Sequence, residues 1–153
     1  DRSNPVDRDA VKPEPAWFTA AYRQPDHPQA AQVLHKLDSG HSMLDARSPE
    51  EYSGKVSGGP RERPGRIPGA VNLPYDSLVK PGSGYFPPVE SLRSAFEQAG
   101  VPLEGEQIAY CHTGHRASVA WFVAHELLGN EKVKLYDGST VEWATDPELP
   151  LER

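Results

Sequence analysis

The stretch Ile108-Ala109-Tyr110-Cys111-His112-Thr113-Gly114-His115-Arg116-Ala117-Ser118 decides the fold class. It begins as an apolar strand, continues as a polar loop that contains the only cysteine of the chain, and leads into an apolar-periodic helix. A cysteine between the carboxyl end of a strand and the amino end of a helix lies where unpaired backbone N–H groups converge, and these groups favour the thiolate. The stretch therefore predicts a nucleophilic cysteine, while the alternative is a small buried core residue.

Strands and helices alternate on both sides of this stretch. Apolar runs predict strands over residues 43–46, 70–73, 108–110 and 133–136. Helical periodicity and helix-end residues predict helices over residues 28–39, 48–52, 89–99 and 119–128. This alternation is typical of an α/β fold with a central parallel sheet, here of about five strands, flanked by helices on both faces. Sites in such sheets lie outside the carboxyl ends of the strands, where Cys111 is found.

The amino-terminal residues differ in composition from the rest of the chain. Residues 1–15 combine charges with three prolines and contain little to bury, which predicts a linker or flexible tail. Trp17 and Phe18 are apolar, so we expect the chain to dock onto one compact domain that spans residues 16–153. All three tryptophans are expected to be packing residues.

The composition limits the classes of function. A net charge of −6 argues against nucleic acid and anionic membrane surfaces as partners. No apolar stretch approaches the ~18 residues of a membrane span. With one cysteine, no internal disulfide and no cysteine-rich zinc site can form, and we expect no metal site. A cytoplasmic location is expected, and a single thiol leaves the periplasm open.

Four ordered segments resemble the successive signatures of a rhodanese domain. They occupy residues 44–52, 65–74, 111–116 and 135–143. The resemblance is closest to the carboxy-terminal, catalytic domain of tandem thiosulfate or 3-mercaptopyruvate sulfurtransferases, and it implies that another rhodanese domain precedes this one in a longer chain. It also implies a ping-pong reaction: the cysteine takes a sulfane sulfur from a small-molecule donor, becomes a persulfide, and passes the sulfur to a thiol or cyanide acceptor. The resemblance implies no cofactor.

The loop residues suggest roles around Cys111, the expected nucleophile and persulfide carrier. Backbone N–H groups of residues 112–116 are expected to hold the negative charge, together with the positive end of the following helix. Gly114 allows the loop to curl, and Thr113 offers a hydroxyl donor. Arg116 closes the loop, where it either binds the oxygens of the donor or locks the loop through a carboxylate.

Other polar residues are candidates for donor binding or support. His112 and His115 add positive charge when protonated, and the alternative is that both only face solvent. The resemblance implies that arginines before the second strand contact the anionic donor, which nominates Arg66 and, more weakly, Arg61. Structural support is expected from two residues near a buried strand end, Asp45 and Arg47.

The donor and the reaction class depend on the composition and length of the loop. Bulky cationic groups in residues 111–116 are similar to thiosulfate-type loops, whereas mercaptopyruvate-type loops commonly read Cys-Gly-Ser-Gly, so thiosulfate is the preferred donor. Cysteine-based phosphatases and arsenate reductases share the strand-loop-helix arrangement, but their loops place five residues between cysteine and arginine, where this chain has four. A non-catalytic sulfur-relay module that receives sulfur from a protein partner is the other alternative.

Overall fold

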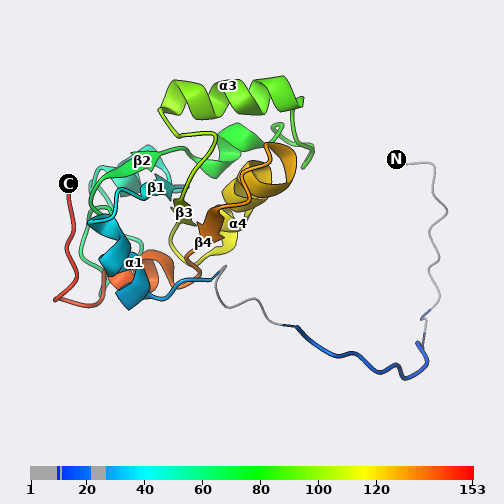
Figure 1. Cartoon of the computed structure of the whole chain (residues 1–153). Helices are drawn as coiled ribbons and strands as arrows, with labels where there is room; N and C mark the ends of the chain where they lie inside the picture. Colours follow the sequence, from blue (N-terminus) through cyan, green and yellow to red (C-terminus); the bar gives the residue numbers. More distant parts are fainter. Residues whose placement is uncertain (1–9, 11, 22–26) are drawn as a thin grey trace.

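The computed structural model describes residues 10, 12–21 and 27–153 (Figure 1). Within them, four strands form one parallel sheet in the order β2-β1-β3-β4. The strands are β1 (Ser42–Asp45), β2 (Ala70–Asn72), β3 (Gln107–Tyr110) and β4 (Val133–Leu135). The predicted α/β class and parallel sheet are confirmed, with four strands where about five were expected.

The four predicted helices are present, with ends that differ by up to a few residues, and one further helix, α5, was not predicted from the sequence. They are α1 (Ala30–Leu37), α2 (Pro49–Tyr52), α3 (Val89–Ala99), α4 (His115–Phe122) and α5 (Ser139–Trp143), with a 3₁₀ turn η2 (Tyr75–Leu78) and a π-helical turn η3 (Val123–Leu127). The predicted helix over residues 119–128 begins earlier, because Gly114 caps α4 and helical geometry starts directly after the polar loop. No helix among the described residues is long and apolar enough to cross a bilayer.

Helices cover both faces of the sheet because successive strand residues point in opposite directions. Leu44, Ala109 and Cys111 pack in a core cluster with residues of α3, α4 and η3. Met43 and Ile108 pack in a second cluster with residues of α1 and α5. Figure 1 shows α1 and α3 on opposite sides of the strands. Cys111 therefore belongs to the α3–α4 face.

The strand ends are aligned at the edge of the sheet that carries the polar loop. Asp45, the last residue of β1, pairs in register with Tyr110 of β3 and Asn72 of β2. The Asn72 side-chain amide donates to the backbone carbonyls of Asp45 and Arg47, which joins the segments that leave β1 and β2. These hydrogen bonds fix the carboxyl ends of β1 and β2 next to the loop that follows β3.

Two aromatic residues near the amino terminus differ from the expectation. Trp17 and Phe18 have relative exposures of 105% and 89%, so neither side chain packs on the domain. The domain boundary at residue 16 stays a prediction, and most of the predicted linker over residues 1–15 lies outside the described residues. Aromatic character indicates a capacity for burial, but burial also needs a facing apolar surface, and none covers these two side chains in the described structure. Trp143 is buried as expected, and Trp121 is half-buried.

Candidate active site

The loop that contains Cys111 runs from the end of β3 to the first turn of α4. Gly114, the residue before α4, has φ +81° and ψ −32°. A Cβ atom at this position would also collide with the Asp137 carboxylate, which lies in the turn between β4 and α5. Both the backbone conformation and the close approach therefore require glycine at this position.

The first residues of α5 hold the Cys111 loop in place through hydrogen bonds. The Ser139 hydroxyl accepts hydrogen bonds from the backbone N–H groups of Cys111 and Gly114, both at 3.1 Å. The backbone N–H of Thr140 donates to the Cys111 carbonyl at 3.1 Å, and that of Val141 donates to the His112 carbonyl at 3.0 Å. Sequence reasoning missed Ser139, although it lies in the fourth segment that resembles rhodaneses.

The loop retains donors for an anion. Among the described residues, no protein group accepts a hydrogen bond from the backbone N–H groups of His112, Thr113, His115 or Arg116. These groups precede or begin α4, whose first turn carries partial positive charge. Cys111 itself is 0% exposed, as a core cysteine would be. The free N–H groups in the residues that follow it distinguish this loop, because a core cysteine needs no unpaired donors next to it in the chain.

Arg116 is locked by a carboxylate. Its two terminal nitrogens donate to the two carboxylate oxygens of Glu51 at 2.6 and 2.8 Å, which joins α4 to α2. The hydrogen bond to Glu51 is the main reason that the pKa of Arg116 is raised, and the Cys111 side chain also raises it. Of the two roles considered for Arg116, the structure thus shows the lock, while the guanidinium stays near enough to Cys111 to interact electrostatically with the thiol.

The hydrogen bond from Arg116 lowers the pKa of Glu51 from 4.5 to about 2. A folded-state pKa below the unfolded value stabilises the fold above the unfolded pKa, and this stabilisation is lost as the pH falls from about 4.5 to about 2. Glu51→Gln should therefore lower the free energy of unfolding by about 2–3 kcal/mol at neutral pH and remove part of its decline over that window.

Urea unfolding of both proteins across this pH range measures the effect. Glu50→Gln is the matched control, because Glu50 is the exposed neighbour in the same helical turn. Equal acid sensitivity of wild-type protein and Glu51→Gln would contradict the assignment of the ion pair as a stabilising lock.

The two histidines of the loop differ in their surroundings. His112 Nε2 lies 2.7 Å from Glu62 Oε1, and the Glu62 side chain is only 6% exposed. Gly58 packs so closely on the His112 ring that a Cβ atom would approach ring carbon Cδ2 to 2.5 Å. His112 therefore packs against residues 58–62 and does not merely face solvent. His115 is exposed, and its Nδ1 lies 3.1 Å from the Thr113 hydroxyl.

The arginines before β2 have different environments. Arg66 lies over the Tyr52 ring, 4.6 Å from its centroid, and 3.5 Å from a Glu152 carboxylate oxygen. Arg63 donates to backbone carbonyls at and after the end of α5. Arg61 is exposed, and its guanidinium has no hydrogen bond or ion pair with any residue in the described part of the chain. Arg61 is therefore the arginine of this segment that is free for an anion, although Arg66 was the stronger candidate from sequence.

Asp45 and Arg47 form a buried network beneath the loop. Arg47 Nη2 donates to Asp45 Oδ2 at 2.6 Å and to the Gly65 carbonyl at 2.9 Å. The Tyr110 hydroxyl donates to the same Asp45 oxygen at 2.8 Å and accepts from the Ile67 N–H. Burial raises the pKa of Tyr110 well above its ordinary value, so it remains a donor. This geometry fits the structural support expected of Asp45 and Arg47.

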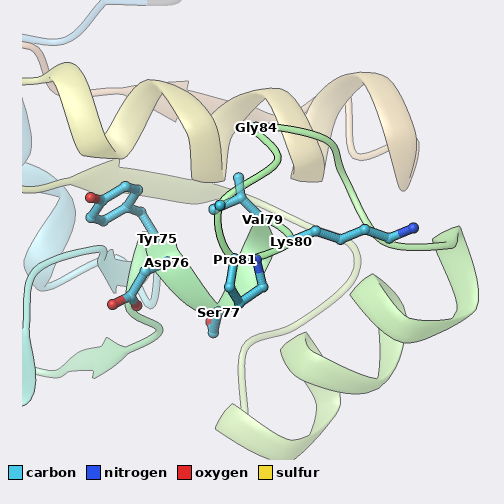
Figure 2. Close-up of a pocket in the computed structure, with 8 residues that line it drawn as sticks. Tyr75, Asp76, Ser77, Val79, Lys80, Pro81 and Gly84 are labelled. Atoms are coloured by element: carbon cyan, nitrogen blue, oxygen red, sulfur yellow. The ribbon is translucent and has the colours of Figure 1, made fainter.

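A separate hollow of about 580 Å³ lies beside α4, lined by residues of η2 and the turn that follows. Figure 2 shows its two charged side chains, Asp76 and Lys80, extending in opposite directions. No cysteine, histidine or arginine lines it. This hollow is therefore not the Cys111 site. No group of three or more His, Cys, Asp or Glu side chains that could hold a metal occurs in the described residues.

Comparison with known proteins identifies the family. The family described as "Rhodanese-like domain" matches residues 29–146. The chain belongs to the rhodanese family. The match contains the whole sheet, the Cys111 loop and the α5 turn that supports it.

Named relatives of this rhodanese-like domain include proteins linked to sulfur chemistry. A Haloferax volcanii protein named "Putative thiosulfate sulfurtransferase" is 40% identical over 126 residues, covering 79% of this chain and 44% of the relative. "Sulfur carrier protein TtuD" of Thermus thermophilus is 38% identical over 127 residues, with the same two shares. This chain thus spans somewhat less than half of each of these two relatives.

A solved structure supports the fold at lower sequence identity. The anaerobic ergothioneine biosynthesis enzyme of Chlorobium limicola, in complex with trimethyl histidine, superposes with a TM-score of 0.75 at 30% identity. The alignment covers 85% of this chain and 32% of that enzyme. Rhodanese-like domains therefore also occur within proteins larger than this chain.

Proposed function

We propose that this domain is a sulfurtransferase that moves a sulfane sulfur from thiosulfate to a thiophilic acceptor through a persulfide on Cys111. The observation that carries the proposal is the loop itself, in which four backbone N–H groups without protein acceptors follow the sole cysteine and lead into α4. The names of the relatives in Haloferax and Thermus support the same chemistry.

The first half-reaction needs only the thiolate and the donor. The Cys111 thiolate attacks the outer sulfur of thiosulfate, a new S–S bond forms, and the original S–S bond breaks as sulfite leaves with its electron pair. The negative charge then resides on the outer sulfur of the persulfide, where the free loop N–H groups stabilise it. No proton, electron or cofactor has to be supplied.

The second half-reaction returns the thiolate. Cyanide or an acceptor thiolate attacks the outer persulfide sulfur, and the bond to Cys111 Sγ breaks with its electron pair left on Sγ. Thiocyanate is the product with cyanide, and the product with a thiolate is a new persulfide on the acceptor. Arg116 would stabilise the charge on Cys111 in both states, because it is held near the sulfur by Glu51.

Arg61 is proposed to attract the anionic donor. It is the sequence neighbour of Glu62, whose carboxylate contacts His112, the residue that follows the nucleophile. Arg61→Gln should raise the KM for thiosulfate by about two- to fivefold and leave kcat unchanged, because an exposed charge pair contributes up to about 1 kcal/mol.

The steady-state rate of thiocyanate formation at a series of thiosulfate concentrations gives the KM for thiosulfate. A higher KM in Arg61→Gln reports the loss of the Arg61 charge. Arg93→Gln, which neutralises an exposed arginine of α3, is the control and should match wild-type protein. A KM for thiosulfate that stays the same in Arg61→Gln would return Arg61 to a solvent-exposed role.

Loop length distinguishes this proposal from phosphatase or arsenate reductase chemistry. Four residues separate Cys111 from Arg116, and a ring of N–H groups this short suits a terminal sulfur better than a tetrahedral phosphoryl group. The protein should form thiocyanate from thiosulfate and cyanide and should not hydrolyse an aryl phosphate. Aryl phosphate hydrolysis without thiocyanate formation would overturn the proposal, and persulfide formation without turnover would favour a sulfur-relay module.

Two finer points belong to the same proposal. 3-Mercaptopyruvate is the second candidate donor, to be compared with thiosulfate in the same assay. The coverage of the named relatives supports a further segment, such as a second rhodanese-like domain, in the full-length protein.

A further inference from the structure

Ser139 has a conformation that is exceptional for its residue type. Its φ is +49°, and it is the sole non-glycine residue with positive φ in the described part of the chain. Positive φ is sterically unfavourable for a residue with a Cβ atom, so such a conformation persists where surrounding interactions impose it. Ser139 is also completely buried.

Three hydrogen bonds explain why serine is retained at this strained position. Its hydroxyl donates to the Tyr136 carbonyl at 2.9 Å and accepts from the N–H groups of Cys111 and Gly114. One oxygen atom thus connects the end of β4 to the first and fourth residues of the loop. A glycine would adopt the backbone conformation more easily but could make none of these bonds.

The two N–H groups that Ser139 binds bracket the loop. Fixing the N–H groups of Cys111 and Gly114 sets the curvature of the residues between them, and Thr140 and Val141 hold the carbonyls of Cys111 and His112 from the same side. The carbonyls of Cys111 and His112 are therefore hydrogen-bonded to α5. The N–H groups of His112, Thr113, His115 and Arg116 are left as the loop's available donors.

We infer that Ser139 is a positioning residue for sulfur transfer: its hydroxyl fixes the curvature at which the free loop N–H groups converge on the sulfur of Cys111. This inference rests on the proposed function, in which those N–H groups stabilise the charge on sulfur. Ser139 acts through the loop and does not touch the reacting atoms, so its effect is on the geometry of the anion site.

The neighbouring residue supplies an internal control. Thr140 is also buried, at 1% exposure, but its hydroxyl has no hydrogen-bond partner in the described structure. Thr140→Val removes that hydroxyl at nearly constant volume and keeps the backbone N–H that binds the loop. Ser139→Ala and Thr140→Val therefore each delete one buried hydroxyl from adjacent positions, and only the first deletion frees loop N–H groups.

The experiment uses two alkylating agents and one sulfur donor. Iodoacetate and iodoacetamide both react with the thiolate, so the ratio of their rate constants reports how strongly the site attracts an anion and is independent of the thiolate fraction. Persulfide formation from thiosulfate in a single turnover reports the chemistry. Ser139→Ala, Ser139→Gly and Thr140→Val are compared with wild-type protein, each well below its melting temperature.

The Ser139 variants should lower the iodoacetate-to-iodoacetamide ratio by about tenfold, the effect of roughly one charge-assisted hydrogen bond. They should slow persulfide formation by about a hundredfold, as expected when a reacting group is misplaced by about 1 Å. Thr140→Val should stay within about twofold of wild-type protein in both measurements. Ser139→Gly keeps the test open if Ser139→Ala does not fold, because glycine removes the strain.

Failure of the proposed function and failure of the inference about Ser139 give different results. If wild-type protein forms no persulfide, the proposed function fails, while the alkylation ratio still tests the positioning by Ser139. If wild-type protein forms persulfide and folded Ser139→Ala or Ser139→Gly gives the wild-type ratio and rate, the inference is overturned. Failure of both variants to fold would also overturn it, because Ser139 would then be required for the fold as a whole.

Discussion

Cys111→Ser should abolish sulfur transfer from thiosulfate to cyanide, with a loss of at least about a thousandfold, because the thiolate is the nucleophile and a hydroxyl is not ionised at neutral pH. Cys111 is the only sulfur nucleophile of this kind in the chain, so no other thiol can replace it. Thiocyanate formation under steady-state conditions is the measurement.

The fold should survive this substitution. Serine is close to cysteine in size, and the groups that hold the loop are backbone atoms and the side chains of Ser139 and Glu51. The circular dichroism spectrum should match that of wild-type protein, which separates lost chemistry from lost structure. Appreciable turnover by Cys111→Ser would contradict the assignment of the nucleophile.

Arg47→Met should destabilise the protein by about 3–5 kcal/mol, which is a large part of the stability of a domain of this size. Asp45 is fully buried, and Arg47 is its charged partner at 2.6 Å. Methionine fills a similar volume, so the loss arises mainly from an uncompensated carboxylate and from the broken bond to the Gly65 carbonyl.

Urea unfolding at neutral pH measures this effect. Arg93→Met, at an exposed position of α3, is the matched control and should change the free energy of unfolding by no more than about 0.5 kcal/mol. A small change for Arg47→Met would mean that Asp45 finds other partners and that the network is not required for the fold.

The alternation of strands and helices could be predicted from sequence because its signals are local. The capping box at Ser48 and Glu51 and the left-handed Gly100 that ends α3 both occur where the sequence indicates them. The Cys111 loop was also predictable, since its residues are contiguous between a strand and a helix. Trp17 was misjudged because burial depends on a facing surface that composition does not reveal.

The partners that shape the site could not be predicted, because folding brings them from distant segments. Ser139, Glu62 and Glu51 stand 28, 50 and 65 positions from the loop residues that they bind. Periodicity does not report such pairings. The sequence explains Glu51 as part of the capping box of α2 and does not indicate a second role. That second role, as the partner of Arg116, depends on how α2 and α4 pack.

The central claim is that Cys111 carries the transferred sulfur, and intact mass spectrometry tests it most directly. Wild-type protein treated with thiosulfate should gain the mass of one sulfur atom, lose it again on addition of cyanide, and show the modification on the peptide that contains Cys111. Cys111→Ser should gain nothing. An unchanged mass after thiosulfate and after 3-mercaptopyruvate, in protein whose Cys111 still reacts with iodoacetamide, would contradict the account.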